Sequence, residues 1–393
     1  MLSAAWLAVA WTGLAQTQAQ ELSLNYMGTF NLPTSTTDQF GNPFDIKGLS
    51  GITWGGGSTF WAVMDNSNKL VQLDVSFNTA GAVSSAVVAG GLTLPLSRDF
   101  EGIAYTDSQR NSVFLSDETS SGMGLREFSL ADGALLQTIA MPAVFANVRS
   151  NYGLESLTRQ RGGQTMWTAN EEALTVDGLL SSTTAGSVVR LQQFDSAGNQ
   201  LTAARQLAYG TEPVHRSTND DPTNPGALSR SGLVDLVALP DGRLLALERS
   251  FVRADFIIPD AGSQYRNSIF LLDLAGATDV SDFTAGLIGE TYDPVGKALL
   301  WSATHGVLSS NPIGNFEGLA LGPQLGSGNH VLLGIVDWPG SGSTDVISAN
   351  RLVAFELVGA IPEPATPVLL LMALVLPALR RPRRQASSRV RRG

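Results

Sequence analysis

The sequence predicts an all-β protein, a β-propeller, preceded by a signal peptide and followed by a short membrane segment. Between residues 22 and 359 there is almost no 3.6-residue periodicity, and short β-rich runs alternate with Gly, Asn, Asp and Ser. A pattern of three strands recurs five times in this region. Because 43% of the 393 residues are hydrophobic, the chain can form a large core.

Each repeat begins with an acidic or small residue at the entry to an apolar strand. A second strand then ends in an acid or an amide, and a third strand follows. The five repeats, aligned on that first residue, start at Ser50, Glu101, Glu155, Asp235 and Glu317. The starts are 51, 54, 80 and 82 residues apart, whereas a four-stranded blade needs about 40–50 residues. We therefore expect six blades, with five or seven as alternatives and a two-domain β-sandwich as the competing architecture.

The two ends of the repeat region supply the remaining elements of a propeller. A propeller closes its ring when the first strand of the chain pairs with the last blade, and residues 24–32 (LNYMGTFNL) are suited to that strand. Hairpin turns are expected at the Asp-Gly pairs 132–133 and 241–242 and at the Gly-Asn pair 198–199.

Residues 1–19 are typical of a secretory signal peptide. An apolar stretch runs from Leu2 to Leu14, and Thr17 and Ala19 are small residues of the kind that precede a cleavage site. The alternative interpretation is an N-terminal strand or helix of the core.

The C-terminal residues 361–393 contain three features in a fixed order. Residues 362–364 read Pro-Glu-Pro, an apolar run of residues 365–379 follows as a predicted transmembrane segment, and an arginine-rich tail begins at Arg380. This order resembles the PEP-CTERM sorting signal of Gram-negative bacteria. The resemblance implies an exported protein that is anchored transiently in the inner membrane. An exosortase-type transpeptidase would then sort it to the cell surface or the extracellular matrix. A plain tail anchor is the alternative.

Composition excludes several classes of function. The chain has no cysteine, which rules out disulfides, thiolate catalysis and Cys-ligated metals, and its three histidines leave few ways to build a His-rich metal centre. Without the seven arginines of the tail and Glu363, the body carries 18 basic and 34 acidic residues, a net charge of −16. Such a body attracts cations and is not expected to bind nucleic acid.

Several segments of the repeats resemble a known family. They read DFEGIAY, GLESLT, GLVDLVALPDGRLLALERSF, and NFEGLALGP with LLGIVD. They are similar to the phytase-like propeller family labelled "esterase-like activity of phytase", over roughly residues 24–359. The resemblance implies a propeller and the hydrolysis of phosphoesters or carboxylic esters, but it does not identify a substrate.

The aligned acids predict a metal site at one mouth of the propeller channel. The first strand of each blade lies nearest the axis, so side chains at the starts of these strands converge there, and the ends of the second strands are expected to ring the same mouth. Carboxylates and amides are ligands for Ca²⁺, which neutralises their mutual repulsion. The second strands end at Asp65-Asn66, Asp117-Glu118, Asn170-Glu171, Glu248 and Asp337. The predicted metal ligands are Glu101, Glu155, Asp235, Glu317, Asp65, Asp117 and Asp337. The alternative is that these acids only accept backbone N–H bonds that lock one blade to the next.

The catalytic and substrate-binding residues are predicted at the same channel mouth. The predicted catalytic residues are Glu101, Glu155, Glu317 and His305, and the predicted substrate-binding residues are Arg98 and Arg249, which can hold an anion bidentately. No G-x-S-x-G motif is present, which disfavours an α/β-hydrolase serine. His305 has a competing interpretation as a loop histidine bonded to backbone, and His215 is expected in a surface insertion.

The sequence thus favours an exported hydrolase that acts on small phosphate or carboxylic esters and depends on calcium. A non-catalytic extracellular propeller that binds polysaccharide or protein in the matrix is the alternative, so enzymatic activity itself stays open.

Overall fold

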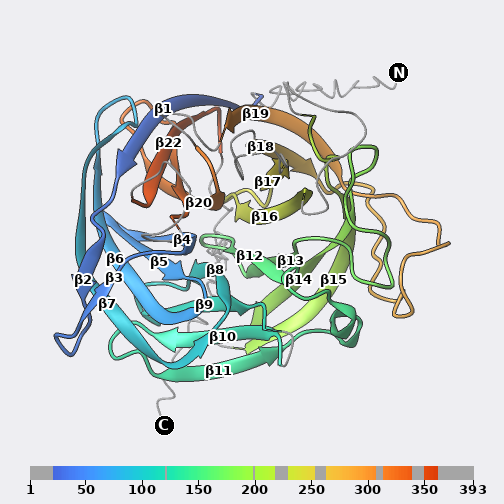
Figure 1. Cartoon of the computed structure of the whole chain (residues 1–393), viewed down its shortest axis with the longest axis horizontal. Coiled ribbons are helices and arrows are strands. Elements are labelled where there is room, and N and C mark those ends of the chain that lie inside the picture. Colours follow the sequence, from blue (N-terminus) through green and yellow to red (C-terminus); the bar gives the residue numbers. More distant parts are fainter. Residues whose placement is uncertain are drawn as a thin grey trace, which may run out of the picture.

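The computed structural model describes residues 21–119, 122–197, 200–216, 229–252, 263–306, 313–338 and 349–361. Over these residues the chain forms five four-stranded antiparallel sheets, arranged as the blades of a propeller around a central axis (Figure 1). The predicted signal peptide and the Pro-Glu-Pro motif, apolar run and arginines of the predicted sorting signal lie outside the described residues. Within the described ranges, no helix has the length and apolar character needed to cross a membrane.

The first three blades follow one another in chain order, each starting at the axis and ending at the rim. Blade 1 contains β4 (Leu49–Gly56), β5 (Thr59–Met64), β6 (Ser67–Phe77) and β7 (Val83–Arg98). Blade 2 contains β8 (Phe100–Tyr105), β9 (Ser112–Asp117), β10 (Gly124–Ser129) and β11 (Leu135–Ala140). Blade 3 contains β12 (Leu154–Arg159), β13 (Thr165–Asn170), β14 (Val188–Ala197) and β15 (Gln200–Gly210).

The last two blades complete the ring, and one of them uses a strand from the start of the chain. Blade 4 contains β16 (Arg230–Ala238), β17 (Leu244–Val252), β18 (Gln264–Asp273) and β19 (Gly296–Gly306). Blade 5 contains β20 (Phe316–Gln324), β21 (His330–Val336), β22 (Arg351–Val358) and β1 (Ser23–Asn31). The remaining elements are the hairpin of β2 (Ser35–Thr37) and β3 (Pro43–Asp45) and the 3₁₀ helix η1 (Ala143–Asn147).

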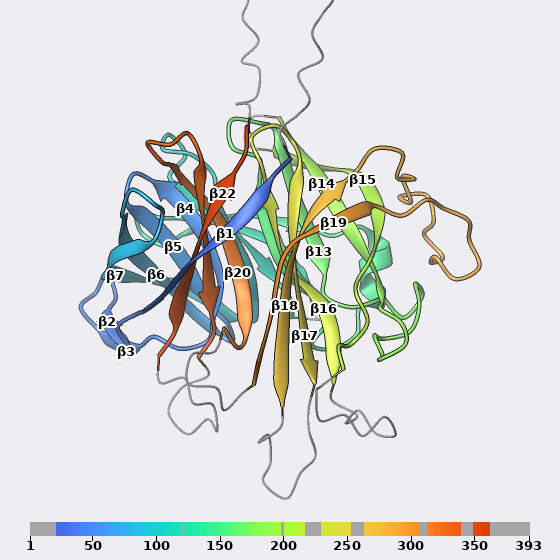
Figure 2. The same ribbon diagram turned by 90° about the horizontal axis from the view of Figure 1, so that it is seen from above.

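The expected closure of the ring is confirmed. β1 pairs antiparallel with β22, from Ser23 opposite Val358 to Asn31 opposite Arg351, and Figure 2 shows the two strands side by side. The strand lies one residue earlier than the expected residues 24–32. Because the two ends of the propeller share one sheet, opening the ring requires breaking a full strand pair.

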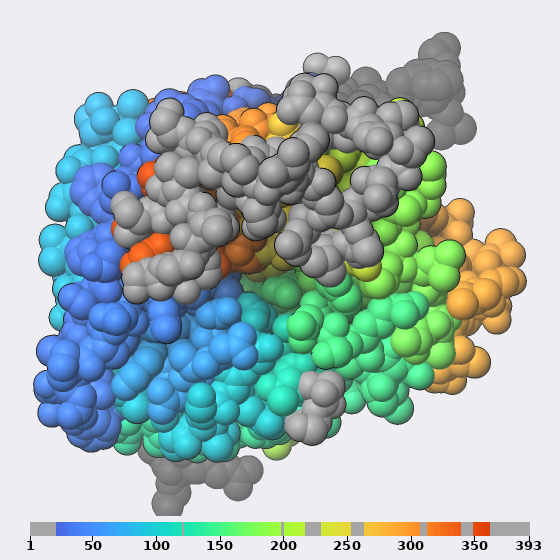
Figure 3. Space-filling model, in the orientation of Figure 1, coloured from blue at the N-terminus to red at the C-terminus, as the bar shows by residue number. Residues whose placement is uncertain are grey.

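The expected six blades are wrong, since the described residues form five. The two long intervals between repeats are filled by connections rather than by another blade. Residues 274–295, between β18 and β19, stand out at the rim in orange (Figure 3). They pack on the outer edge of blade 3, where the N–H of Val280 donates to the carbonyl of Gln206 at 2.8 Å. The buried Arg190 also donates to the carbonyls of Val280 and Phe283 while pairing with Asp177 at 2.7 Å.

The hydrophobic core lies between neighbouring blades. Among the described residues, five clusters of buried apolar side chains each join two adjacent blades, and a sixth lies under residues 274–295. The inner strands are buried on both faces, so they read as nearly continuous apolar runs, whereas the outer β11 alternates between exposed and half-buried residues. Phe100 and Phe128 meet edge to face at 5.6 Å. Removing one such buried ring costs about 3–5 kcal/mol.

Every inner strand carries a β-bulge near its start, and this bulge positions the site. In β4 the pairing moves from Leu49 opposite Met64 to Gly51 opposite Val63, which leaves Ser50 as the extra residue. The same shift occurs in β8, β12, β16 and β20. A bulge bends the strand and re-aims its extra side chain, here at the same height in all five blades.

Candidate active site

Two sets of equivalent positions meet at the mouth where the inner strands begin. The bulges place the first set there: Ser50, Glu101, Glu155, Val234 and Glu317. In each second strand one residue lies opposite the residue just before the bulge, and the next residue along the chain belongs to the second set: Asp65, Glu118, Glu171, Arg249 and Asp337. We call the acids of both sets, together with Asp99, the acidic mouth: Asp65, Asp99, Glu101, Glu118, Glu155, Glu171, Glu317 and Asp337.

The most compact group in the acidic mouth is Asp99, Glu101 and Glu118. One carboxylate oxygen of each lies within 4.8 Å of the other two. Glu101 is 9% exposed, and its carboxylate has no hydrogen bond or ion pair in the described part of the chain. The buried Oδ1 of Asp99 also has no hydrogen-bond partner there. Glu118 accepts the N–H of Gly153 at 2.5 Å, which fixes its orientation.

The pKa values of the buried glutamates in this part of the mouth are raised, so ionising all of them at once is unfavourable. Burial, followed by the charges of Glu118 and Glu317, raises the pKa of Glu101 well above its usual range. Burial and the charge of Glu101 do the same to the pKa of Glu155. Burial raises the pKa of Glu118 to about 7, to which the charge of Asp99 also contributes. A divalent cation would relieve both the burial cost and the repulsion.

The other side of the mouth has similar electrostatics. Burial raises the pKa of Asp337 to about 8 and that of Asp65 to about 6, and Glu317 contributes to both shifts. The Oδ1 atom of Asp337 is buried without a hydrogen-bond partner among the described residues. The charge of Glu317 raises the pKa of both Glu101 and Glu155, and the charge of Glu101 raises that of Glu155. These three glutamates therefore converge as predicted.

Arg249 occupies the position of an acid in blade 4. Its guanidinium pairs with Glu171 of blade 3 at 3.0 Å and with Glu317 of blade 5, and it also donates to the side chain of Asn315 at 2.6 Å. Burial opposes the charged form of Arg249, but these two glutamates keep its pKa above the usual range. Arg249 therefore offsets negative charge on the side of the mouth formed by Glu171 and Glu317.

Arg98, the other predicted substrate-binding residue, lies beside the Asp99 group. It lines a cavity of about 300 Å³ together with Asp99 and Glu118. Its Nε donates to Asp117 at 2.9 Å, and Arg126 binds the same carboxylate at 2.7 Å. Asp117, a predicted metal ligand, is thus fully buried between two arginines and faces away from its neighbour Glu118.

The predicted alignment of Asp235 with the mouth acids is one residue out of register. The bulge residue of β16 is Val234, and Asp235 is equivalent to Gly51 of β4. Its carboxylate accepts the backbone N–H of Leu236 at 2.8 Å and that of Leu319, on blade 5, at 2.6 Å. For Asp235 the structure thus favours the alternative role of locking blades together.

His305 does not join the mouth. It lies on β19, the outermost strand of blade 4, opposite Tyr265, and β16, β17 and β18 separate it from the axis. Burial lowers the pKa of His305, which favours its neutral form. The structure gives no contact between this histidine and the acidic residues.

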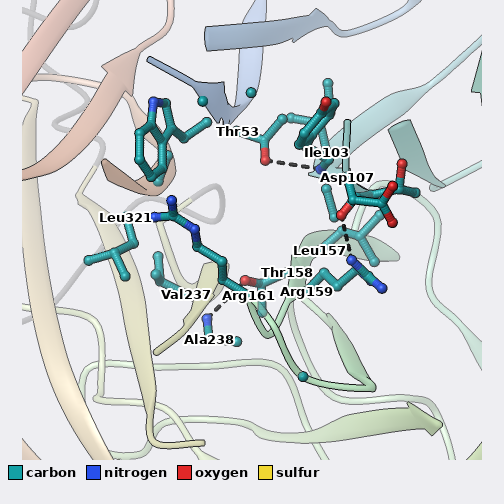
Figure 4. Close-up of a pocket in the computed structure, with 18 of the residues that line it drawn as sticks. Thr53, Ile103, Asp107, Leu157, Thr158, Arg159, Arg161, Val237, Ala238 and Leu321 are labelled. Carbon is teal, nitrogen blue, oxygen red and sulfur yellow. Dashed lines mark hydrogen bonds between the residues drawn. The ribbon is translucent and has the colours of Figure 1, made fainter. Parts of the chain in front are cut away.

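The opposite mouth of the channel contains a larger cavity, of about 670 Å³ (Figure 4). Its floor is apolar, and Thr53 and Thr158 accept backbone N–H bonds from the next blades, Thr158 from Ala238 at 2.8 Å. In the lining of this cavity, Cζ of Arg161 lies over the Trp54 ring, 4.0 Å from its centre. Asp107 is the one acid in its lining. The acidic mouth at the other end of the channel contains eight, so it is the better candidate for acid–base chemistry.

Sequence reasoning missed Asp99 and chose Asp117 and Glu248 where the structure places Glu118 and Arg249. Successive side chains in a strand point to opposite faces, so only one residue of each pair, Asp117 and Glu118 or Glu248 and Arg249, can face the mouth. Asp99 stands two residues before Glu101, in RDFEG, at the entry of the inner strand.

Comparisons with known proteins place the chain in a family. Solved structures to which the chain is similar include a luciferin-regenerating enzyme, with 9% identity, a TM-score of 0.34, and 88% of this chain and 99% of that chain covered. Another is the periplasmic gluconolactonase PpgL of Pseudomonas aeruginosa, with 13% identity, a TM-score of 0.33, and 87% and 100% covered. No curated protein matches the chain.

The family model "Phytase-like: Esterase-like activity of phytase" matches residues 45–337. The matched region contains all five inner strands and every residue of the acidic mouth, from Asp65 to Asp337. The chain therefore belongs to the phytase-like family that this model describes.

Proposed function

We propose that this protein is a calcium-dependent hydrolase of small phosphate or carboxylic esters, with the acidic mouth as its active site. The observation that carries the proposal is the group of Asp99, Glu101 and Glu118, whose oxygens lie within 4.8 Å of one another. Membership of the phytase-like family supports ester hydrolysis as the reaction class.

These three residues have the donor set that Ca²⁺ prefers, namely carboxylate oxygens, and water or substrate would complete its six to eight ligands. The raised pKa values of Glu101 and Glu118 reflect the cost of burying these carboxyls close together without a cation. When bound, calcium would polarise the ester oxygen and make an attacking water more acidic.

The chain's own residues would handle the proton and the substrate. The carboxylate of Glu155 has no hydrogen bond or ion pair among the described residues, and Glu101 and Glu118 raise its pKa, so it is placed to accept a proton from water. Arg98 lines the same cavity as Asp99 and would orient an anionic group. A volume of about 300 Å³ favours a small ester over a highly phosphorylated substrate.

Hydrolysis of 4-nitrophenyl acetate and 4-nitrophenyl phosphate tests the proposal. The purified protein should hydrolyse at least one of them faster with calcium than with a calcium chelator. If neither is turned over while calcium still raises the melting temperature, the protein is instead a calcium-stabilised binding module. Activity that is unchanged by the chelator would refute the metal-dependent mechanism.

We also propose export and sorting to the cell surface, from the patterns in residues 1–19 and 361–393. An exosortase-type transpeptidase is the partner that the Pro-Glu-Pro, apolar and arginine segments would require.

A further inference from the structure

A third cavity, of about 560 Å³, lies between blades 3 and 4 and shares no lining residue with the acidic mouth. One wall is formed by residues 212–215, which follow β15, and the other by one face of blade 4. Its size is within the usual range of pockets for small molecules. The lining is unusual for an interface between blades, because much of it consists of hydroxyl and charged side chains.

A serine and a histidine from the two walls meet in this cavity. Nδ1 of His215 lies 2.8 Å from Oγ of Ser250, which is near the end of β17. The backbone N–H of His215 also donates to the same Oγ at 3.0 Å. That N–H occupies one lone pair of the oxygen, and in the Nε2–H tautomer of the ring the hydroxyl donates its proton to Nδ1. His215 is 4% exposed, so the expected surface insertion is wrong at this residue.

The imidazole of His215 is held in its neutral form, in which one ring nitrogen has a lone pair. Burial, and to a smaller extent the charge of Arg266, lowers the pKa of His215 to about 4, so the imidazole is neutral near pH 7. A neutral ring with Nδ1 as acceptor carries its proton on Nε2. That Nε2 atom is buried and has no hydrogen-bond partner in the described part of the chain.

A third polar group lies beside the pair. Ser231 of β16 stands directly opposite Ser250, so their Cβ atoms are about 5 Å apart. Its Oγ is buried and lacks a hydrogen-bond partner among the described residues, although it lines the cavity. A free hydroxyl at this distance can donate to an oxygen that becomes negative when Ser250 attacks a carbonyl.

The charged groups of the cavity favour a neutral substrate. Lys297 pairs with Glu248 at 2.6 Å and with Glu212 at 2.9 Å, and Arg266 is the second cation of the lining, so two positive and two negative side chains balance there. Phe270 and Leu299 supply apolar surface in the same lining. This combination suits the acyl part of an uncharged carboxylic ester better than a phosphate.

We propose that Ser250 and His215 form a second, metal-independent site that hydrolyses small neutral carboxylic esters through an acyl-serine. Oγ of Ser250 attacks the carbonyl carbon while its proton passes to Nδ1 of His215, and the C–O bond to the alkoxy group breaks. The histidine returns the proton to the leaving alcohol. Water then cleaves the acyl-serine, which releases the carboxylic acid and restores the hydroxyl of Ser250. The site goes beyond the proposed function, since it uses neither calcium nor the acidic mouth.

Covalent labelling of the full-length protein tests this site. The probe is phenylmethylsulfonyl fluoride in the presence of a calcium chelator, followed by mass spectrometry of the digested protein. We expect a single sulfonyl adduct on Ser250 and a labelling rate at least tenfold lower in His215→Gln. The chelator separates this outcome from the proposed function, which it abolishes.

Ser268→Ala is the matched control, because Ser268 is a buried serine of the same cavity whose hydroxyl bonds to Ser302. This variant should label like the wild type, and Ser250→Ala should not label although it melts as one folded species. Absence of an adduct on Ser250 in the folded wild-type protein overturns the proposal. So does equal labelling of His215→Gln and wild type.

Discussion

At the scale of single residues, the acidic mouth opposes the stability of the fold. Glu101 is a buried carboxyl without a hydrogen bond or ion pair in the described residues, and Glu155 and Glu118 add like charges beside it. A buried polar group left without a partner costs on the order of 1–3 kcal/mol. The family relation and this cost together favour a functional reason for these acids.

Glu101→Gln should weaken calcium binding and reduce ester hydrolysis at least about tenfold, which corresponds to about 1.4 kcal/mol in the barrier. The substitution keeps the size of the side chain but removes one ligand charge from the group with Asp99 and Glu118. Calorimetric titration with calcium and initial rates measure the two effects. Glu290→Gln, at an exposed residue, is the control for the loss of one charge. Equal calcium affinities in wild type and Glu101→Gln would exclude Glu101 as a ligand.

The raised pKa values also predict how stability depends on pH. Glu118 has a pKa of about 7 and Asp337 of about 8 in the folded protein, above the ordinary values of 4.5 and 3.8. The folded state therefore binds more protons than the unfolded state between these values, so stability falls as the pH rises from about 4 to about 8.

Thermal unfolding in chelator should accordingly give a lower melting temperature at pH 8 than at pH 5. Calcium should raise the melting temperature more at pH 8, where the carboxyls must ionise. A larger calcium effect at pH 5 would contradict the assignment of these groups as the metal site.

At the scale of elements, the inner strands determine the geometry of the site. Their bulges re-aim Glu101, Glu155 and Glu317 to one mouth, and glycines next to the bulges let the strands approach at the axis. A Cβ atom on Gly102 of β8 would lie less than 3.0 Å from the backbone nitrogen of Leu157 on β12. Backbone cannot move aside as a flexible side chain can, so a substitution here must shift a strand.

Gly102→Ala should therefore lower the free energy of unfolding by about 1–3 kcal/mol. Gly90→Ala is the matched control, since Gly90 lies in the outer strand β7 and a Cβ there has no neighbour within 4 Å. That control should change stability by less than about 0.5 kcal/mol. Urea denaturation of both variants measures the difference, and equal stabilities would show that the inner strands tolerate a wider ring.

At the scale of the whole molecule, the strand pair of β1 and β22 closes the ring next to both predicted export segments. β1 begins at Ser23, shortly after the predicted signal peptide, and β22 ends at Val358, just before the Pro-Glu-Pro motif. Ser23 and Val358 are direct partners in the sheet. Removal of both segments would therefore leave the closed propeller intact.

We expect the tail to be cut near residues 362–364, so that the mature protein lacks the apolar run and the arginines. Mass spectrometry of the protein recovered from the cell surface or the medium of its native host tests this. Peptides that contain Met372 or Arg384 in that mature fraction would contradict processing at the motif. A strain without the transpeptidase should retain those peptides and serves as the control.

The sequence by itself determined the propeller class, the closing strand and the convergence of Glu101, Glu155 and Glu317, because local alternation and an internal repeat are written in neighbouring residues. Only the tertiary structure decided that there are five blades, since an interval of 80 residues does not distinguish a blade from an insertion. It also decided that Val234 replaces Asp235 in the bulge and Glu118 replaces Asp117 at the mouth. A one-residue change of register turns a side chain to the other face, and the register depends on contacts between strands. His215 and Ser250 are 35 residues apart, so only packing between two blades could bring them together.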